Sequence, residues 1–539
     1  MFVISFFLFI TLSNTAQTSL PIEPPPTLQA LPIEVQAVIQ QSGYLKASNA
    51  GAGDFFGISV ALDGDTLAVG AYLEDGNGSS PDDNSALDAG TVYIFQRQGA
   101  NWVQTAYLKA SNAGAGDEFG KAVALDGNTL VVGAYGEDSN GSGPDDNSAL
   151  GAGAVYVFQR QGAAWVQTAY LKASNAAGGD NFGRSVVLDG DTLAVGALGE
   201  DSNGSSPDDN STAAAGAVYI FQRQGAAWIQ AAYLKASNAG ANDLFSFPVA
   251  LDGDTLAVGA LGEDSNGSSS GDNSAADAGA VYVFQRQGAA WVQTAYLKAS
   301  NAGAGDQFGS AVALNGEKLV AGAPFERSNG SSPNDNSTDA VGAVYVFQLQ
   351  GTAWVQTAYL KASNAGVNDL FGYEVALNGN TLAVGAPFES GNGSSPSDNS
   401  ATAAGAIYIF QQQGGWGQTA YLKASNAESG DNFGSSIALD GDTLAVGAPG
   451  EDSNGSSAND NSTAAAGAVY IIDVLPEFNP SPALPGPLVM NSAAPTTTFT
   501  IDNRATGSFL LNVVWIRSRL AIRLPAACPS LAYPARPAR

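Results

Sequence analysis

Short apolar runs, separated by glycine, serine and asparagine, recur along most of the chain. In the first clear block, residues 57–62, 66–71 and 91–96 are such runs, and residues 102–110 alternate apolar and polar side chains. Runs of this length that are rich in valine, isoleucine and aromatic residues predict β-strands. The run at 91–96 is apolar at nearly every position, which is typical of a strand buried on both faces, whereas the alternation at 102–110 predicts an outer strand.

Glycines mark the ends of these strands. Asp63-Gly64, between the first and second strands, predicts a two-residue hairpin, because a type I′ turn needs positive φ at both central positions. The second strand closes with Gly70-Ala71, where the lack of side-chain bulk favours close approach of an adjacent blade, although small residues suit a tight turn equally well.

The whole block occurs seven times at a spacing of 63 residues, or 62 for the last copy. The copies begin at Tyr44, Tyr107, Tyr170, Tyr233, Tyr296, Tyr359 and Tyr421. A four-stranded unit cannot bury both faces by itself, so a repeat of this length predicts a closed ring of blades. We therefore expect an all-β fold, a seven-bladed β-propeller over residues 36–474.

A count of strand types predicts how the ring closes. Seven sets of the first three strands exist, but only six fourth strands follow them, starting at Trp102, Trp165, Trp228, Trp291, Trp354 and Trp416. Residues 38–47 supply an unpaired strand of the same type. We expect this N-terminal strand to complete the last blade, which leaves no open sheet edge.

The segments outside the ring differ in composition. Residues 1–20 contain an apolar run from 2 to 12, long enough for a signal peptide and short for a membrane span, which predicts export to the outside or surface of the cell. Residues 21–35 form a proline-rich spacer. Residues 475–539 are predicted to be an irregular tail whose arginine-rich end is typical of a frameshifted terminus or of a basic anchor.

The recurring core resembles the FG-GAP repeat of integrin α-chain propellers and their bacterial relatives. In the last copy it comprises Phe433-Gly434, then Gly447-Ala448-Pro449, then residues 467–471. The resemblance implies a propeller, a fold that hosts adhesion, ligand-binding and some hydrolytic proteins. The calcium loop of the integrin type is replaced here by a short Leu-Asp-Gly-Asp-Thr turn, so its ligands cannot be transferred. Copy four has Phe245-Ser246 and Pro248 at the start of its first strand, so we expect that blade to begin differently.

Charge and composition exclude several classes of partner and of catalytic or metal site. The formal net charge is −29, and the chain has no histidine and one cysteine, Cys528. Acidity argues against nucleic acids and anionic membranes as partners. Catalytic triads with histidine, zinc sites of cysteine and histidine, and disulfides within the chain are excluded.

Most of the acidic residues should gather on one face of the ring. In an up-and-down blade, the loop after the second strand and the loop after the fourth strand emerge on the same side. These loops hold 34 of the 50 acidic residues, and Arg327 is the one basic residue that the sequence places among them. Oxygen ligands at this density are those that calcium prefers.

Calcium is therefore the expected cofactor at this face. The candidate ligands are loop acids and asparagines: Glu74, Asp75, Asp83, Glu137, Asp138, Asn140, Asp146, Glu200, Asp201, Asn203, Asp209, Glu263, Asp264, Asp272, Glu451, Asp452 and Asp460. The same residue types are ordinary turn formers, so a purely structural role has equal weight. The aspartate before each Phe-Gly pair, such as Asp117, is expected to be a hydrogen bonder in a turn.

The first functional hypothesis is a non-enzymatic, secreted or cell-surface module for binding or adhesion. It would act as a monomer and meet a protein or glycan at the acidic face, without nucleic acid and without membrane insertion. The second is a hydrolase or lyase that uses paired carboxylates, and the third is a purely structural repeat body. An active site should make one copy differ from the others in its acidic residues. The differences present are losses of an acidic residue, as at Arg327 and Ser390, which disfavours catalysis.

Overall fold

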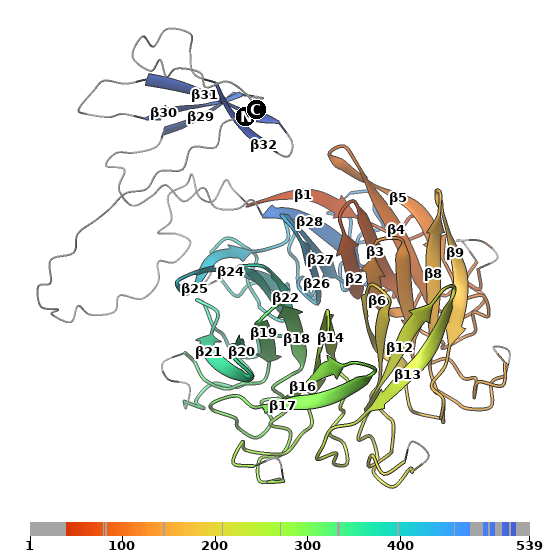
Figure 1. Cartoon of the computed structure of the whole chain (residues 1–539). Helices are drawn as coiled ribbons and strands as arrows, with labels where there is room; N and C mark the ends of the chain where they lie inside the picture. Colours follow the sequence, from red (N-terminus) through yellow and green to blue (C-terminus); the bar gives the residue numbers. More distant parts are fainter. Residues whose placement is uncertain are drawn as a thin grey trace, which may run out of the picture.

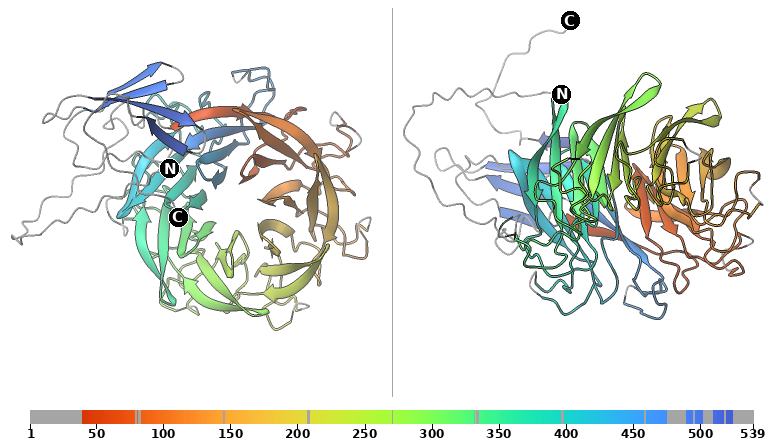
Figure 2. Two further views of the ribbon diagram at one scale, coloured as in Figure 1. Left: turned by 45° about the horizontal axis from the view of Figure 1, so that its top comes forward. Right: turned by 90° about the horizontal axis from the view of Figure 1, so that it is seen from below.

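The computed structural model describes a ring of seven four-stranded antiparallel sheets around a central axis (Figures 1 and 2). Residues 39–474 are described except 79, 81–82, 144–145, 207–208, 270, 331, 333–334, 396–397 and 458, together with four strands between 489 and 523. No helix of the described residues is long and apolar enough to cross a membrane. The ring confirms the predicted seven-bladed propeller.

The strands of the blades recur in the same order. The innermost strands are β2 (Ser59–Asp63), β6 (Phe119–Asp126), β10 (Phe182–Asp189), β14 (Val249–Asp252), β18 (Ala311–Asn315), β22 (Glu374–Asn378) and β26 (Ser436–Asp440). The second strands are β3 (Thr66–Ala71), β7 (Thr129–Ala134), β11 (Thr192–Ala197), β15 (Thr255–Ala260), β19 (Lys318–Ala323), β23 (Thr381–Ala386) and β27 (Thr443–Ala448). The third strands are β4 (Thr91–Gln98), β8 (Ala154–Gln161), β12 (Ala217–Gln224), β16 (Ala280–Gln287), β20 (Ala343–Gln350), β24 (Ala406–Gln413) and β28 (Ala468–Val474). The outermost strands are β5 (Asn101–Leu108), β9 (Ala164–Leu171), β13 (Ala227–Leu234), β17 (Ala290–Leu297), β21 (Ala353–Leu360), β25 (Gly415–Leu422) and β1 (Ile39–Leu45).

The ring closes as predicted. Strand β1 pairs antiparallel with β28, from Ile39 opposite Val474 to Leu45 opposite Val469, and becomes the outer strand of the last blade. The chain therefore begins and ends the ring in the same sheet. Leu45 also packs into an apolar cluster with residues of the first and last blades, among them Phe56 and Ile471.

The hairpin between the first two strands is present, but its turn differs from the prediction. Asp63 pairs with Thr66, so the central residues are Gly64 and Asp65. Gly64 has φ of +54° and Asp65 is not among the residues with positive φ. This is the φ pattern of a type II′ turn, in which only the first central residue needs positive φ. The predicted type I′ turn was wrong because the turn lies one residue later in the chain.

Adjacent blades meet at the glycines that close the second strands. A Cβ atom on Gly133 would lie 1.9 Å from the carbonyl oxygen of Gly183, in the next blade. The same contact recurs between Gly447 and Gly57, where the last blade meets the first. The predicted close approach at the Gly-Ala pairs is therefore confirmed, and it is an approach between blades.

The core lies between the blades. Each apolar cluster combines side chains from two neighbouring sheets, such as Val157 of the second blade and Val195 of the third. Phe119 is fully buried and contacts the Tyr156 ring edge to face at 5.4 Å between centroids, a favoured aromatic geometry. The third strands are buried at their first five positions, and the outer strands alternate, as the sequence predicted.

The fourth blade begins differently, as expected. Its first strand, β14, starts at Val249, after Pro248, which is one position later in the repeat than the start of β2, β18, β22 and β26, whereas β6 and β10 start at the phenylalanine of the Phe-Gly pair. Proline has no N–H to donate to a neighbouring strand, so regular pairing begins after it. Beyond residue 474, β29 (Val489–Ala493), β30 (Thr496–Ile501), β31 (Phe509–Ile516) and β32 (Arg519–Arg523) form an antiparallel sheet in that order.

Candidate functional site: the acidic loop face

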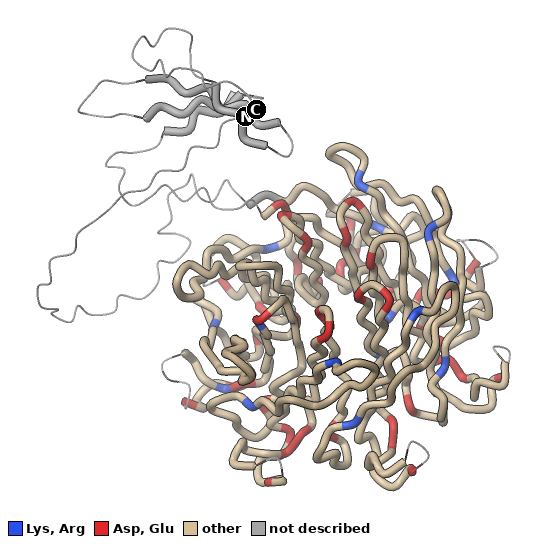
Figure 3. The backbone as a smooth tube through the Cα atoms, viewed as in Figure 1, with Lys and Arg blue, Asp and Glu red and all other residues tan. Residues whose placement is uncertain are grey.

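The two kinds of acid-bearing loop lie together on one side of the ring. The Gly116 N–H, in the loop that enters the second blade, donates to the Leu87 carbonyl in the long loop of the first blade at 2.9 Å. An equivalent bond joins Gly53 to Ala464 across the closure of the ring. In Figure 3, acidic residues recur along the long loops at the ends of the blades. The predicted gathering of these loops on one face is confirmed.

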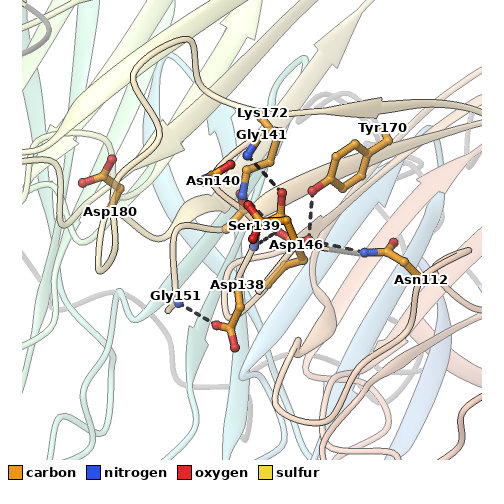
Figure 4. A network of polar contacts seen from close by, with 12 residues as sticks. Asn112, Asp138, Ser139, Asn140, Gly141, Asp146, Gly151, Tyr170, Lys172 and Asp180 are labelled. Carbon is orange, nitrogen blue, oxygen red and sulfur yellow. Dashed lines mark hydrogen bonds and ion pairs between the residues drawn. The ribbon is translucent and has the colours of Figure 1, made fainter. Parts of the chain in front are cut away.

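The glutamate at the start of each long loop is buried. Glu137 follows β7, and its carboxylate accepts hydrogen bonds from Lys172 Nζ at 2.9 Å, Tyr170 Oη at 2.8 Å and the Ser139 N–H at 3.0 Å. Asn112, from the loop that precedes the blade, donates its Nδ2 to the same carboxylate at 3.3 Å. Figure 4 shows Asn112, Ser139, Tyr170 and Lys172 converging from separate segments. We call this arrangement the glutamate anchor.

The glutamate anchor occurs in all seven blades, each time with a lysine from the end of the outermost strand. The pairs, at 2.7–3.0 Å, are Lys109 with Glu74, Lys172 with Glu137, Lys235 with Glu200, Lys298 with Glu263, Lys361 with Glu326, Lys423 with Glu389 and Lys46 with Glu451. In the last blade the lysine comes from the N-terminal segment, after β1, and so belongs to the ring closure.

These lysines correct the charge count made from the sequence. Arg327 is not the only cation at the loop face, because seven lysines lie there and each compensates a buried glutamate. Their signal in the sequence is the recurring Tyr-Leu-Lys at the end of each outermost strand, as in Tyr170-Leu171-Lys172. Burial lowers the pKa of Lys172, and its contact with Glu137 opposes that shift.

A second layer of the loop is held by aspartates. Asp138 accepts the Gly151 N–H at 2.8 Å, which joins the start of the long loop to its end. Asp75, Asp201, Asp264 and Asp452 accept a backbone N–H from the residue 13 positions later in the same way. These residues act as loop ties.

The third layer faces solvent. Asp146 accepts hydrogen bonds from the Ser142 and Ser148 hydroxyls at 2.8 and 3.0 Å, and these bonds lower its pKa. Asn140 accepts the Ser142 N–H and donates to Ser148. Asp83, Asp209, Asp272, Asp398 and Asp460 accept equivalent serine bonds, and Asn203 takes the place of Asn140 in the third blade. The aspartates of this layer are partly exposed. Hydrogen bonds from serine also lower the pKa values of Asp209, Asp272 and Asp460, so these carboxylates and that of Asp146 are ionised at neutral pH.

The aspartate before each Phe-Gly pair is buried and caps its turn, as predicted. Asp117 accepts the Gly114 N–H at 2.7 Å. Burial raises the pKa of Asp117 to about 7, and the nearby Glu137 raises it further. The equivalent aspartates of the other blades have pKa values raised to about 6 or 7 for the same reason: Asp54, Asp180, Asp243, Asp306, Asp369 and Asp431.

The predicted ligands are thus divided among three layers. Within the described residues, no three histidine, cysteine, aspartate or glutamate side chains come together in a group that could hold a metal ion. A cation at Glu137 would compete with Lys172, which already lies against that carboxylate. The exposed aspartates and their asparagine neighbours are the predicted ligands that remain open to a cation from solvent.

The sequence matches the FG-GAP repeat model at residues 40–95, 102–158, 165–221, 228–284, 291–347, 354–410 and 416–472. Each matched unit contains the outermost strand of one blade and the three inner strands of the next, so the first unit supplies β1 to the last blade. No match is found among curated proteins. Because the seven units cover most of the chain and form one closed ring, the chain belongs to the FG-GAP repeat family and is a seven-bladed β-propeller.

Proposed function

We propose that this protein is a non-enzymatic binding module whose binding surface is the acidic loop face. One observation carries the proposal: buried lysines compensate the seven anchor glutamates, whereas the exposed aspartates around the same face, such as Asp146 and Asp209, have serine and asparagine partners. The negative charge that is accessible to solvent therefore lies on loops whose first residues are fixed by the glutamate anchors. FG-GAP propellers are typically non-catalytic, which also supports a binding role.

The proposed partner is a protein or glycan that presents positive charge. Aspartates repeated around a ring can contact several groups of one partner at once, and such multivalency raises affinity without new types of contact. Net charge of −29 favours cationic partners through long-range attraction and disfavours nucleic acids. We place the protein outside the cell or on its surface, because the apolar run at residues 2–12 is typical of an export signal.

Calcium is the cation that we propose for the exposed layer. A carboxylate such as Asp146, with the amide oxygen of Asn140 close by in the same loop, offers the hard oxygen ligands that calcium prefers. Such a site would be weak, because calcium needs six to eight ligands and water would supply most of them. Bound calcium would then rigidify the acidic face that meets the partner.

Binding of defined probes tests the proposal. The full chain is immobilised, and the binding of an oligolysine peptide, an oligoglutamate peptide and a chitosan oligomer is measured at low and physiological salt. We expect the two cationic probes to bind with strong salt dependence and the oligoglutamate peptide not to bind. A loop variant changes five exposed aspartates to asparagine and should lose most of the binding: Asp146, Asp209, Asp272, Asp398 and Asp460.

A matched variant controls for the loss of charge. It changes five aspartates in the short turns between the first and second strands, which lie at the other end of the blades: Asp63, Asp126, Asp189, Asp252 and Asp440. Asn315 already occupies this position in the fifth blade and accepts the same backbone bond, from Gly379, so the change is tolerated by the fold. Equal loss of binding in both variants, or no binding of either cationic probe, would refute the loop face as the binding surface.

A further inference from the structure

The seven blades differ most where their innermost strands begin. The residue that follows the Phe-Gly pair, or Phe-Ser in the fourth blade, is Ile58, Lys121, Arg184, Phe247, Ser310, Tyr373 or Ser435. In contrast, the anchor glutamate and the buried tyrosine of the third strand are the same in all seven copies. One position of the repeat therefore carries six residue types in seven copies, although the fold needs the same geometry from each.

All seven of these variable residues line one cavity. It has a volume of about 350 Å³ and is lined by residues from the innermost strand of every blade. These strands surround the axis of the ring (Figure 2), so the cavity lies on that axis. Variation at this position changes the side chains that line the cavity. Such a cavity is of the size that accepts a small organic molecule.

Two cations stand on adjacent blades at this wall. Lys121 lies over the Tyr72 ring at 4.1 Å, and Arg184 lies over the rings of Tyr135 and Phe247 at 5.1 and 4.7 Å. Across the described part of the chain, neither cation forms an ion pair with a carboxylate within 4.0 Å. This contrasts with the seven anchor lysines, each of which has a glutamate partner.

Two acidic residues, Glu374 and Glu118, lie in or close to this wall. Glu374 is partly exposed and lines the cavity, and burial raises its pKa to about 8. Glu118 is close enough to affect the pKa of Lys121, Tyr135 and Arg184, and its Oε2 is buried without a hydrogen-bond partner. The wall thus carries two cations, Lys121 and Arg184, with Glu118 close to both of them.

Aromatic and aliphatic groups complete the cavity. Phe247, Phe325 and Tyr373 line it, and about 40% of the Phe325 and Tyr373 side chains is exposed. Exposed aromatic rings beside unpaired cations are suited to a ligand that has an acidic group and an apolar body.

We propose that the central cavity binds a small organic anion, whose carboxylate, sulfate or phosphate group pairs with Lys121 and Arg184 and whose apolar body packs against Phe247 and Tyr373. This site is independent of the proposed loop face. Its ligand has the opposite charge to the partner proposed for the loops.

A fluorescent probe tests the site in the full chain. The probe is 8-anilinonaphthalene-1-sulfonate, and the comparison compound is N-phenyl-1-naphthylamine, which has the same aromatic body without the sulfonate. We expect saturable binding of the sulfonate at one site and at least fivefold weaker binding of the uncharged compound. Lys121→Met and Arg184→Met should each weaken sulfonate binding at least fivefold, while Arg184→Lys should retain more of it than Arg184→Met.

Two controls make the result specific. Arg286→Met removes the same charge at the end of β16, outside the cavity, and should leave binding unchanged. The loop variant with five aspartates changed should also bind the sulfonate normally, which separates this proposal from that of the loop face. Circular dichroism and the melting temperature show whether each variant is folded. Equal binding of the uncharged compound, or equal affinity of folded Lys121→Met and Arg184→Met variants and the parent, would overturn the proposal.

Discussion

The glutamate anchor leads to a quantitative prediction for stability. In the second blade, the Lys172 and Glu137 side chains are only 8% and 2% exposed. Replacing Lys172 with methionine keeps most of the aliphatic stem but leaves the Glu137 carboxylate buried without a counter-charge. Removing one partner of a buried ion pair costs about 3–5 kcal/mol. Because Tyr170, Asn112 and the Ser139 N–H still donate to the carboxylate, we expect a value near 3 kcal/mol, at the lower end of that range.

The expected change in melting temperature follows from the size of the ring. Unfolding entropy is about 2.1 cal/mol/K per residue, so the ring of residues 39–474 has about 0.9 kcal/mol/K if it melts as one unit. A loss of about 3 kcal/mol therefore lowers the melting temperature by about 3 °C. The shift is measurable by calorimetry or circular dichroism of the full chain, with Arg286→Met as a control for the loss of one positive charge.

A double variant separates the charge effect from loss of packing. Combining Lys172→Met with Glu137→Gln removes both buried charges, and the glutamine keeps an oxygen that can accept from Tyr170. We expect the double variant to melt at a higher temperature than Lys172→Met alone. If Lys172→Met shifts the melting temperature by no more than Arg286→Met does, or if the two single effects simply add, the pair is not coupled and the reasoning fails.

Three further predictions follow from the ring and its loops. The seven capping aspartates, including Asp117, have raised pKa values and favour the protonated form in the folded state, so the melting temperature should rise as the pH falls from 8 to 5; a fall over this window would contradict the assignment. Deleting residues 32–47 removes β1 and Lys46, which should cause aggregation or loss of the cooperative melt, whereas an unchanged melt would refute this closure. Gly133→Ala should lower the melting temperature by several degrees because its Cβ would meet the Gly183 carbonyl, while Gly143→Ala, in open space, should change it little.

Calcium gives a separate test of the exposed loop layer. With a dissociation constant of about 1 mM, 10 mM calcium would stabilise each occupied loop by about 1.4 kcal/mol. Several occupied loops would raise the melting temperature by several degrees relative to EDTA, and the five-aspartate loop variant should lose this rise. An unchanged melting temperature would leave the exposed aspartates as a solvated surface without bound calcium.

The fold was accessible from the sequence because its signals are local and repeated seven times. The apolar run at residues 91–96, the glycine turns and the absence of a fourth strand after the seventh set together predicted the blades and their closure, and the structure confirms them. The predicted turn type at Gly64 was wrong because the turn lies one residue later than expected, and the turn type depends on which two residues are central. Pro248 correctly indicated a different fourth blade because the absence of an N–H is a property of the residue itself.

At the loop face and the axial cavity, the sequence predicted the positions of loops but not the contacts between their side chains. The sequence by itself determined the number of blades, the side on which the acidic loops lie and the segment that closes the ring, since each depends on spacing along the chain. Only the tertiary structure showed that Glu137 meets Lys172, 35 positions away, and that Lys121 and Arg184 share one axial cavity. The Glu137–Lys172 pair depends on how strands β7 and β9 are placed within one sheet, and the axial cavity depends on how all seven sheets are placed around the ring. Both are distances in space between residues far apart in the sequence, and they exist only in the folded chain.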